Sequence, residues 1–91
     1  VDVRWIAGDQ ETRLLSAGQH LIHGNEGDTV SLLPIGGDAL DIKTENLYYP
    51  LTHEPLFFGP ARGISNVMTA DSARVTFDAG RLLLIHTIGR A

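Results

Sequence analysis

The segment "RGISN", Arg62 to Asn66, holds the side chains of this chain best suited to recognise a polar ring. The asparagine carboxamide offers two N–H donors and one acceptor, and the serine hydroxyl can both donate and accept. Such a pair matches a heteroaromatic ring that carries an amino group beside a ring nitrogen. Leu84, on a neighbouring strand, could cover the face of that ring. The alternative is a structural turn, in which Gly63 adopts an unusual φ while Ser65 and Asn66 cap nearby backbone groups.

The four histidines do not form a metal-binding motif. His20 and His23 are three residues apart, which on a β-strand points them to opposite faces. A zinc site needs three or four converging ligands, and no spacing here provides them. We therefore expect no metal site. His86 has apolar neighbours, so we expect it to be a hydrogen-bonded histidine of the core or of an interface.

Catalytic motifs are also missing from the sequence. A hydrolytic triad can be composed from Ser65, His53 and Asp71, but no nucleophile elbow accompanies these residues. The glycine pair Gly36–Gly37 is not followed by the Lys-Ser/Thr of a phosphate-binding loop. We therefore expect no catalysis by this chain alone, and a hydrolase ranks last among the functions considered.

Composition excludes several classes of protein. The chain has 91 residues, 11 acidic and 7 basic, with a net charge of −4, and its basic residues are scattered. Nucleic-acid binding is therefore disfavoured, whereas a small cationic ligand is tolerated. The longest apolar run, Leu82 to Ile85, is far too short to span a membrane. The absence of cysteine excludes disulfides and thiolate metal sites and fits a cytoplasmic protein.

Apolar and polar residues alternate with a period of two along most of the chain, which is typical of strands with one buried face. Residues 1–7, 39–44 and 73–78 show this pattern most clearly. Turn signals separate about seven or eight such segments. We expect an all-β fold: an antiparallel β-sandwich, either jelly-roll-like or a partly open barrel, of about seven or eight short strands. It would form a single domain over residues 1–91.

Three local features complete this prediction. Residues 79–81, "AGR", are expected to turn the chain into its last strand, and Asn46 to take a positive φ before a strand over 47–51. The longest segment without strand character runs from Thr52 to about Met68. Because it carries its own apolar residues and three prolines stiffen its surroundings, we expect an ordered loop that bears binding residues.

Two blocks in this order resemble a known family. The run "DTVSLLPIGGDALDIKTENLYYPLTHEPLFFGPARGISNVM", followed by "ARVTFDAGRLLLI", is similar to the C-terminal thiamine-binding domain of thiamine pyrophosphokinase. The "SLLP" strand and the "RGISN" segment carry the likeness. Residues 1–28 match the opening hairpin of that domain more loosely.

The resemblance implies a role in an enzyme that transfers the pyrophosphoryl group of ATP to thiamine and releases AMP. An N-terminal domain would hold ATP and Mg²⁺, and the β domain would help to bind thiamine and to build a homodimer. This chain lacks the ATP-binding domain and begins at Val1 without methionine. We therefore expect it to be the C-terminal fragment of a longer enzyme, inactive and without a bound cofactor by itself.

The resemblance also assigns residues. It implies that Ser65 and Asn66 lie at the aminopyrimidine of thiamine and that Arg62 and Gly63 shape the same segment. Leu84 aligns with a position that is aromatic in some members of the family, so aliphatic contact would replace ring stacking here.

Two hypotheses follow. The leading one is a thiamine-binding and dimerisation domain that positions its substrate for a reaction carried out with the ATP-binding domain. The alternative is a β module that serves dimerisation or other interactions without binding a ligand, since Leu84 is aliphatic and the chain is a bare fragment.

Overall fold

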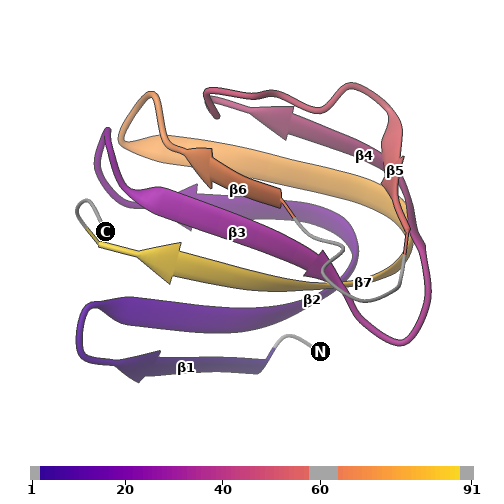
Figure 1. The fold of residues 1–91 in the computed structure, drawn as a ribbon, viewed down its shortest axis with the longest axis horizontal. Coiled ribbons are helices and arrows are strands. Elements are labelled where there is room, and N and C mark those ends of the chain that lie inside the picture. Colours follow the sequence, from indigo (N-terminus) through magenta and orange to yellow (C-terminus); the bar gives the residue numbers. More distant parts are fainter. Residues whose placement is uncertain (1–2, 58–63, 89–91) are drawn as a thin grey trace.

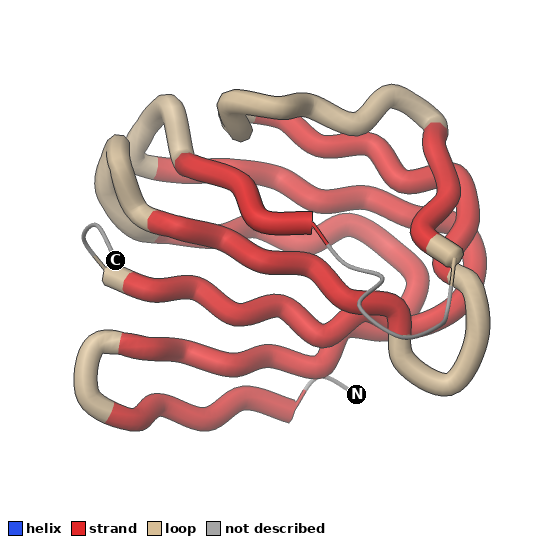
Figure 2. The backbone as a smooth tube through the Cα atoms, in the orientation of Figure 1, coloured by secondary structure: helices blue, strands red, loops and turns tan. Residues whose placement is uncertain are grey.

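The computed structural model describes residues 3–57 and 64–88, and the side chains of Val3 and Ile64 lie outside that description. Within these residues the regular structure consists of β-strands, and no helix is long and apolar enough to cross a bilayer. The strands are β1 (Val3–Ala7), β2 (Gln10–His23), β3 (Thr29–Pro34), β4 (Ala39–Glu45), β5 (Glu54–Leu56), β6 (Ile64–Val67) and β7 (Ser72–Thr87). All pairings are antiparallel. The predicted all-β fold is confirmed (Figures 1 and 2).

Two long strands, β2 and β7, pass through both layers of the sandwich. In the first layer the order is β1, residues 10–16 of β2, residues 82–87 of β7, then β3 and β6. In the second layer residues 18–23 of β2 pair with the beginning of β7, which pairs with β4, and β4 pairs with β5. Figure 1 shows β7 passing from the second layer (orange) into the first (yellow). One continuous sheet thus folds over on itself without closing into a barrel.

Glycines mark the points where the long strands bend. The register between β2 and β7 shifts between Ser16 and Gly18, and Gly18 has φ +140°. In β7, Gly80 has φ +93°, and a Cβ atom there would clash with the backbone of Asp38 and Ala39. Only glycine combines this conformation with such a close approach. The prediction of a turn at residues 79–81 is therefore wrong: β7 bends and continues, so two of the seven strands are long, with 14 and 16 residues.

The core lies between the layers, where the inward side chains of β2, β3, β4 and β7 meet. Its members are Leu15, Ile22, Val30, Leu32, Ala39, Ile42, Leu47, Met68, Ala73, Val75, Phe77, Leu82 and Leu84, none more than 4% exposed. Alternation along β3 and β7 produces this arrangement, because every second side chain points inward. Burial of these apolar side chains is the main stabilising contribution to the fold.

The segment that follows β4 differs from its prediction. Asn46 has the expected positive φ, +63°. The predicted strand over residues 47–51 does not form, although Leu47 makes an isolated bridge with Met68. Conversely, the segment from Thr52 to Met68 was expected to lack strands but contains β5 and β6. The residues of the "RGISN" segment that the structure describes therefore lie on a strand rather than on a loop.

The prediction for His86 is confirmed. Its side chain is 3% exposed, and Nε2 lies 2.7 Å from Oδ2 of Asp28, whose side chain is 2% exposed. The same carboxylate oxygen accepts a hydrogen bond from the backbone N–H of Asn25 at 3.0 Å. Nδ1 of His86 has no hydrogen-bond partner among the described residues, and Oε1 of Glu11 lies 3.7 Å away. A buried polar pair thus ties the end of β7 to the start of β3.

Candidate functional site

The side of the first layer that points away from the core is almost free of charge. Directly paired residues of neighbouring strands project to the same side of a sheet. One row across the five strands consists of Trp5, Thr12, Ile85, Ser31 and Ser65. The other rows contain Ala7, Gln10, Thr87, Thr29 and Val67; Leu14, Leu83 and Leu33; and Ser16 and Arg81. We call this side the outer face. Among these residues Arg81 alone is charged.

Two serines meet on the outer face. Ser31 of β3 is directly opposite Ser65 of β6, and their Oγ atoms are 3.2 Å apart. Ile85 is the neighbour of Ser31 on the other side, in β7. Ser65 is exposed, whereas Ser31 and Ile85 are half-buried. Each hydroxyl can donate one hydrogen bond and accept others. The pair can therefore engage a ligand that presents a donor and an acceptor side by side, with aliphatic surface next to it.

Asn66, the next residue along β6, points to the opposite side and is only 2% exposed. Its Oδ1 accepts hydrogen bonds from the backbone N–H groups of Tyr49, at 2.8 Å, and Val67, at 3.1 Å. Its Nδ2 donates to the carbonyl oxygen of Tyr49 at 2.6 Å. The carboxamide therefore binds the segment after β4 to the edge strand β6. This is the backbone-capping role that the sequence left open, and a direct contact with a ligand stays a prediction.

The structure does not bring Leu84 and Ser65 together. Leu84 is fully buried in the core, between Arg13 of β2 and Leu32 of β3, on the side opposite to Ser65. Two aliphatic residues of β7, Leu83 and Ile85, share the outer face with Ser65, and Ile85 lies in the same row as Ser65. Arg62 and Gly63, also predicted for the site, lie outside the described residues.

Sequence reasoning missed Ser31 and Ile85. Both lie inside the stretches that carry the resemblance, but their relevance depends on the pairing of β6 with β3 and of β3 with β7. Ser31 and Ser65 are 34 residues apart in the sequence. The alternation of "SLLP" could have placed Ser31 on one face of its strand, but not beside Ser65.

Titratable side chains away from the outer face include a surface cluster around Asp41. Within residues 3–57 and 64–88, no three histidine or carboxylate side chains are arranged to hold a metal ion. His53 Nδ1 lies 2.7 Å from Asp41 Oδ1 on the surface. The hydrogen bond with Asp78 lowers the pKa of Asp41, and that with His53 lowers it further. The same Asp41–Asp78 contact raises the pKa of Asp78. His53 is thus paired with Asp41, whereas the hydrolytic triad considered above would need Asp71 as its partner.

Comparison with known proteins identifies the family. The family model described as "Thiamin pyrophosphokinase, vitamin B1 binding domain" matches residues 19–82. Thiamine pyrophosphokinase from Bacillus subtilis superposes with a TM-score of 0.84 at 21% identity, covering 97% of this chain and 42% of that one. The enzyme from Geobacillus thermodenitrificans superposes with a TM-score of 0.78 at 21% identity, covering 86% of this chain and 37% of that one. The enzyme from Candida albicans superposes with a TM-score of 0.74 at 15% identity, covering 96% of this chain and 33% of that one.

The structural matches share the fold of this chain, which spans less than half of the length of each of these three proteins. The resemblance in the "SLLP" and "RGISN" blocks is confirmed, since both blocks lie within the matched residues. Because the family model matches most of its length, the chain belongs to the thiamin pyrophosphokinase vitamin B1-binding domain family.

Proposed function

We propose that the outer face binds thiamine and that the hydroxyl pair of Ser31 and Ser65 contacts its aminopyrimidine. The single observation that carries the proposal is this pair, 3.2 Å apart and beside Ile85, in a chain of the vitamin B1-binding family. An amino group next to a ring nitrogen offers a donor and an acceptor, which two adjacent hydroxyls complement. The aliphatic side chain of Ile85 would contact the ring.

The remaining predicted residues would support the site around Ser31 and Ser65. Asn66 would hold β6 in place through its bonds to Tyr49, so that Ser65 stays on the outer face. Arg62 and Gly63 precede Ser65 in the sequence and would shape the approach to it. Leu84, packed in the core, would support the strand that carries Ile85.

In the whole enzyme this domain would present thiamine to ATP held by a separate N-terminal domain. The three superposed thiamine pyrophosphokinases are more than twice as long as this chain, which supports such an arrangement. The reaction would transfer the pyrophosphoryl group to the hydroxyl of thiamine and release AMP. Since the described residues offer no cluster of acidic ligands, we assign Mg²⁺ to the N-terminal domain and derive no step through it. The role of this chain is then to position one reactant, a proximity effect.

The proposal extends to the whole enzyme, which would be a cytoplasmic homodimer. The β domain by itself would be inactive. The lack of cysteine fits a reducing compartment. The net charge of −4 also favours the approach of thiamine, which carries a positive charge.

Titration of thiamine into the ¹⁵N-labelled chain, followed by amide NMR, tests the site. We expect saturable shifts at Ser31, Ser65 and Ile85. Ser65→Ala should weaken binding by about threefold to tenfold, because one hydrogen bond is lost. Ser72→Ala, in the second layer, serves as the matched control and should bind thiamine like the parent chain. Shifts centred away from the outer face would contradict the assignment.

One observation favours the alternative, a β module that serves interaction only. Trp5 and Ile6 are neighbours on the edge strand β1, on opposite faces of it, and are 55% and 65% exposed. An exposed apolar edge strand is a common docking element. If the chain associates through β1 but shows no thiamine-dependent shift up to millimolar concentrations, this alternative replaces the thiamine site. Sedimentation of the parent chain and of Trp5→Ser measures the association.

A further inference from the structure

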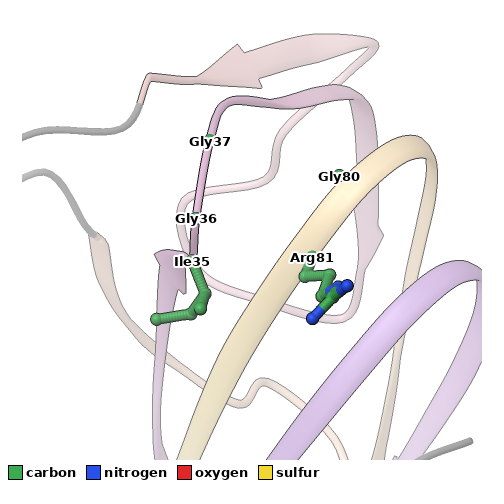
Figure 3. Close-up of a pocket in the computed structure, with 5 residues that line it drawn as sticks. All are labelled: Ile35, Gly36, Gly37, Gly80 and Arg81. Atoms are coloured by element: carbon green, nitrogen blue, oxygen red, sulfur yellow. The ribbon is translucent and has the colours of Figure 1, made fainter.

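A hollow of about 420 Å³ lies at the end of the outer face, where β7 bends toward the second layer. Its wall consists of Ile35, Gly36, Gly37, Gly80 and Arg81, which Figure 3 shows around the turn after β3. A second hollow of about 240 Å³ adjoins Arg81 and is lined by Leu14, Leu15 and Ser16. Arg81 therefore belongs to both hollows.

The guanidinium of Arg81 has no partner of its own among the described residues. Its backbone carbonyl accepts a hydrogen bond from the N–H of Ile35 at 3.1 Å, which fixes the main chain at this point. In contrast, Arg4 pairs with Glu11, and Arg74 lies 3.4 Å from Glu45. A planar guanidinium without a carboxylate partner is suited to bidentate contact with an oxyanion.

Gly37 is a glycine that the fold itself does not require. Its φ is not in the left-handed region, and a Cβ atom at this position would meet nothing within 4 Å. Gly80, on the opposite wall, differs because its backbone packs closely against Asp38. A glycine at position 37 leaves bare backbone on the wall of the hollow, which allows a ligand to approach the main chain closely.

We propose that the hollow at Arg81 is a binding site for a phosphate-type oxyanion, a phosphate or diphosphate group. The guanidinium supplies the charge, and the open backbone at Gly37 supplies access. Asp38 follows directly in the sequence, and its negative charge limits the affinity, so we expect a dissociation constant of about 1 mM.

The anion can come from two sources. One is a free inorganic ion. The other is the phosphorylated end of a ligand that lies along the outer face, and this source rests on the proposed function. Arg81 is four residues from Ile85 on β7, which corresponds to about 13 Å along an extended strand. A phosphorylated thiamine with its pyrimidine at Ser31 and Ser65 would direct its anionic end toward Arg81.

Inorganic pyrophosphate, titrated at constant ionic strength into the ¹⁵N-labelled chain, tests the site without any ring compound. We expect saturable shifts at the amides of Gly36 and Gly37 and at Nε–H of Arg81. Arg81→Gln should weaken binding by about tenfold, because a charged hydrogen-bond donor is lost. Arg81→Lys, which keeps the charge, should bind pyrophosphate with an affinity between those of the parent chain and Arg81→Gln. Arg74→Gln is the matched control and should bind like the parent chain.

The same titration with thiamine and with thiamine diphosphate separates the two sources. If Arg81→Gln weakens the binding of thiamine diphosphate but not that of thiamine, and the shifts extend to Ser31 and Ser65, the ligand is phosphorylated thiamine. Shifts confined to Gly36, Gly37 and Arg81 identify a free anion, and both results support the oxyanion site. The site is overturned if pyrophosphate shifts are unsaturable, or if Arg81→Gln binds it like the parent chain. Because pyrophosphate has no ring, this result is independent of the thiamine site.

Discussion

The carboxamide of Asn66 holds both backbone polar groups of Tyr49. Oδ1 accepts the Tyr49 N–H at 2.8 Å, and Nδ2 donates to the Tyr49 carbonyl at 2.6 Å. Tyr48 adds a backbone hydrogen bond to the carbonyl of Val67 at 2.9 Å. The chain after β4 thereby runs along the edge of β6 without forming a strand there. An asparagine can replace a strand partner in this way because it carries the same donor and acceptor as a peptide group.

Replacing Asn66 by alanine should therefore lower the free energy of unfolding by about 2–3 kcal/mol, since three hydrogen bonds are lost and the backbone groups stay partly buried. Urea denaturation followed by circular dichroism measures this change. Ser65→Ala, one residue away but exposed, should stay within about 0.5 kcal/mol of the parent chain. Equal stabilities of the two variants would show that the Asn66 bonds contribute nothing.

The two variants also separate positioning from contact in the proposed thiamine site. Asn66→Ala should broaden or shift the amides of Tyr48 and Tyr49 even without ligand, because their segment loses its attachment. Ser65→Ala should leave those signals in place and change thiamine binding alone. If Asn66→Ala left the Tyr49 amide unmoved, Asn66 would be free for the ligand, as the sequence first indicated.

The fold class was predictable from the sequence because alternation over β4 and the first half of β7 can be seen in single segments. The burial of His86 was also predictable, since its neighbours are apolar. The bend at Gly80 was not: it shifts the phase of alternation, so that Phe77 and Leu82 both face the core. Because residues 82–85 are all apolar, nothing local indicates which of them point inward. Leu84 was therefore expected beside Ser65, although Ile85 is the residue that shares its face.

The candidate site was predictable in part for a related reason. Ser65 belongs to a recognisable block, but its partner Ser31 is brought beside it by pairing between β3 and β6. Such pairing depends on the whole sheet and on burial of one of its faces. A single sequence shows the faces of each strand but not the neighbours across strands.

Gly24 should tolerate no larger residue, because it packs directly on the buried pair of His86 and Asp28. A Cβ atom there would lie 2.6 Å from Oδ2 of Asp28 and 2.7 Å from the imidazole ring. Gly24→Ala is expected to lower the free energy of unfolding by about 1–3 kcal/mol through overpacking. Denaturant unfolding measures the loss. Gly37→Ala, where a Cβ atom meets nothing within 4 Å, is the control and should change stability by less than about 0.5 kcal/mol.

Substitution of His86 should lower the free energy of unfolding at least as much as Gly24→Ala. His86→Leu keeps an apolar volume but leaves the Asp28 carboxylate buried, with its bond to the Asn25 N–H but without the imidazole. We expect a loss of about 3 kcal/mol, the usual consequence of breaking a buried pair by removing one partner. The double variant His86→Leu with Asp28→Asn should recover part of it, because the amide that replaces the buried carboxylate carries no charge. No recovery would show that packing, rather than charge, accounts for the loss.

Asp41 and Asp78 should titrate on opposite sides of their ordinary pKa of 3.8. Their mutual hydrogen bond lowers the pKa of Asp41 and raises that of Asp78, and His53 lowers the pKa of Asp41 further. The contribution of Asp41 to stability is present above 3.8 and is lost as the pH falls through its lowered pKa. That of Asp78 is present below 3.8 and is lost as the pH rises through its raised pKa. The pair therefore stabilises most at a pH between the two pKa values, where one proton lies between the two carboxylates.

Carboxyl ¹³C NMR measures both titrations. Asp41→Asn should bring the pKa of Asp78 down toward 3.8, because it removes the negative charge that makes Asp78 hold its proton more tightly. His53→Gln should have the opposite sign and raise the pKa of Asp78 further, since the positive charge of His53 lowers it. The shared proton is contradicted if Asp78 titrates at its ordinary value in the parent chain, or if Asp41→Asn leaves its midpoint where it was.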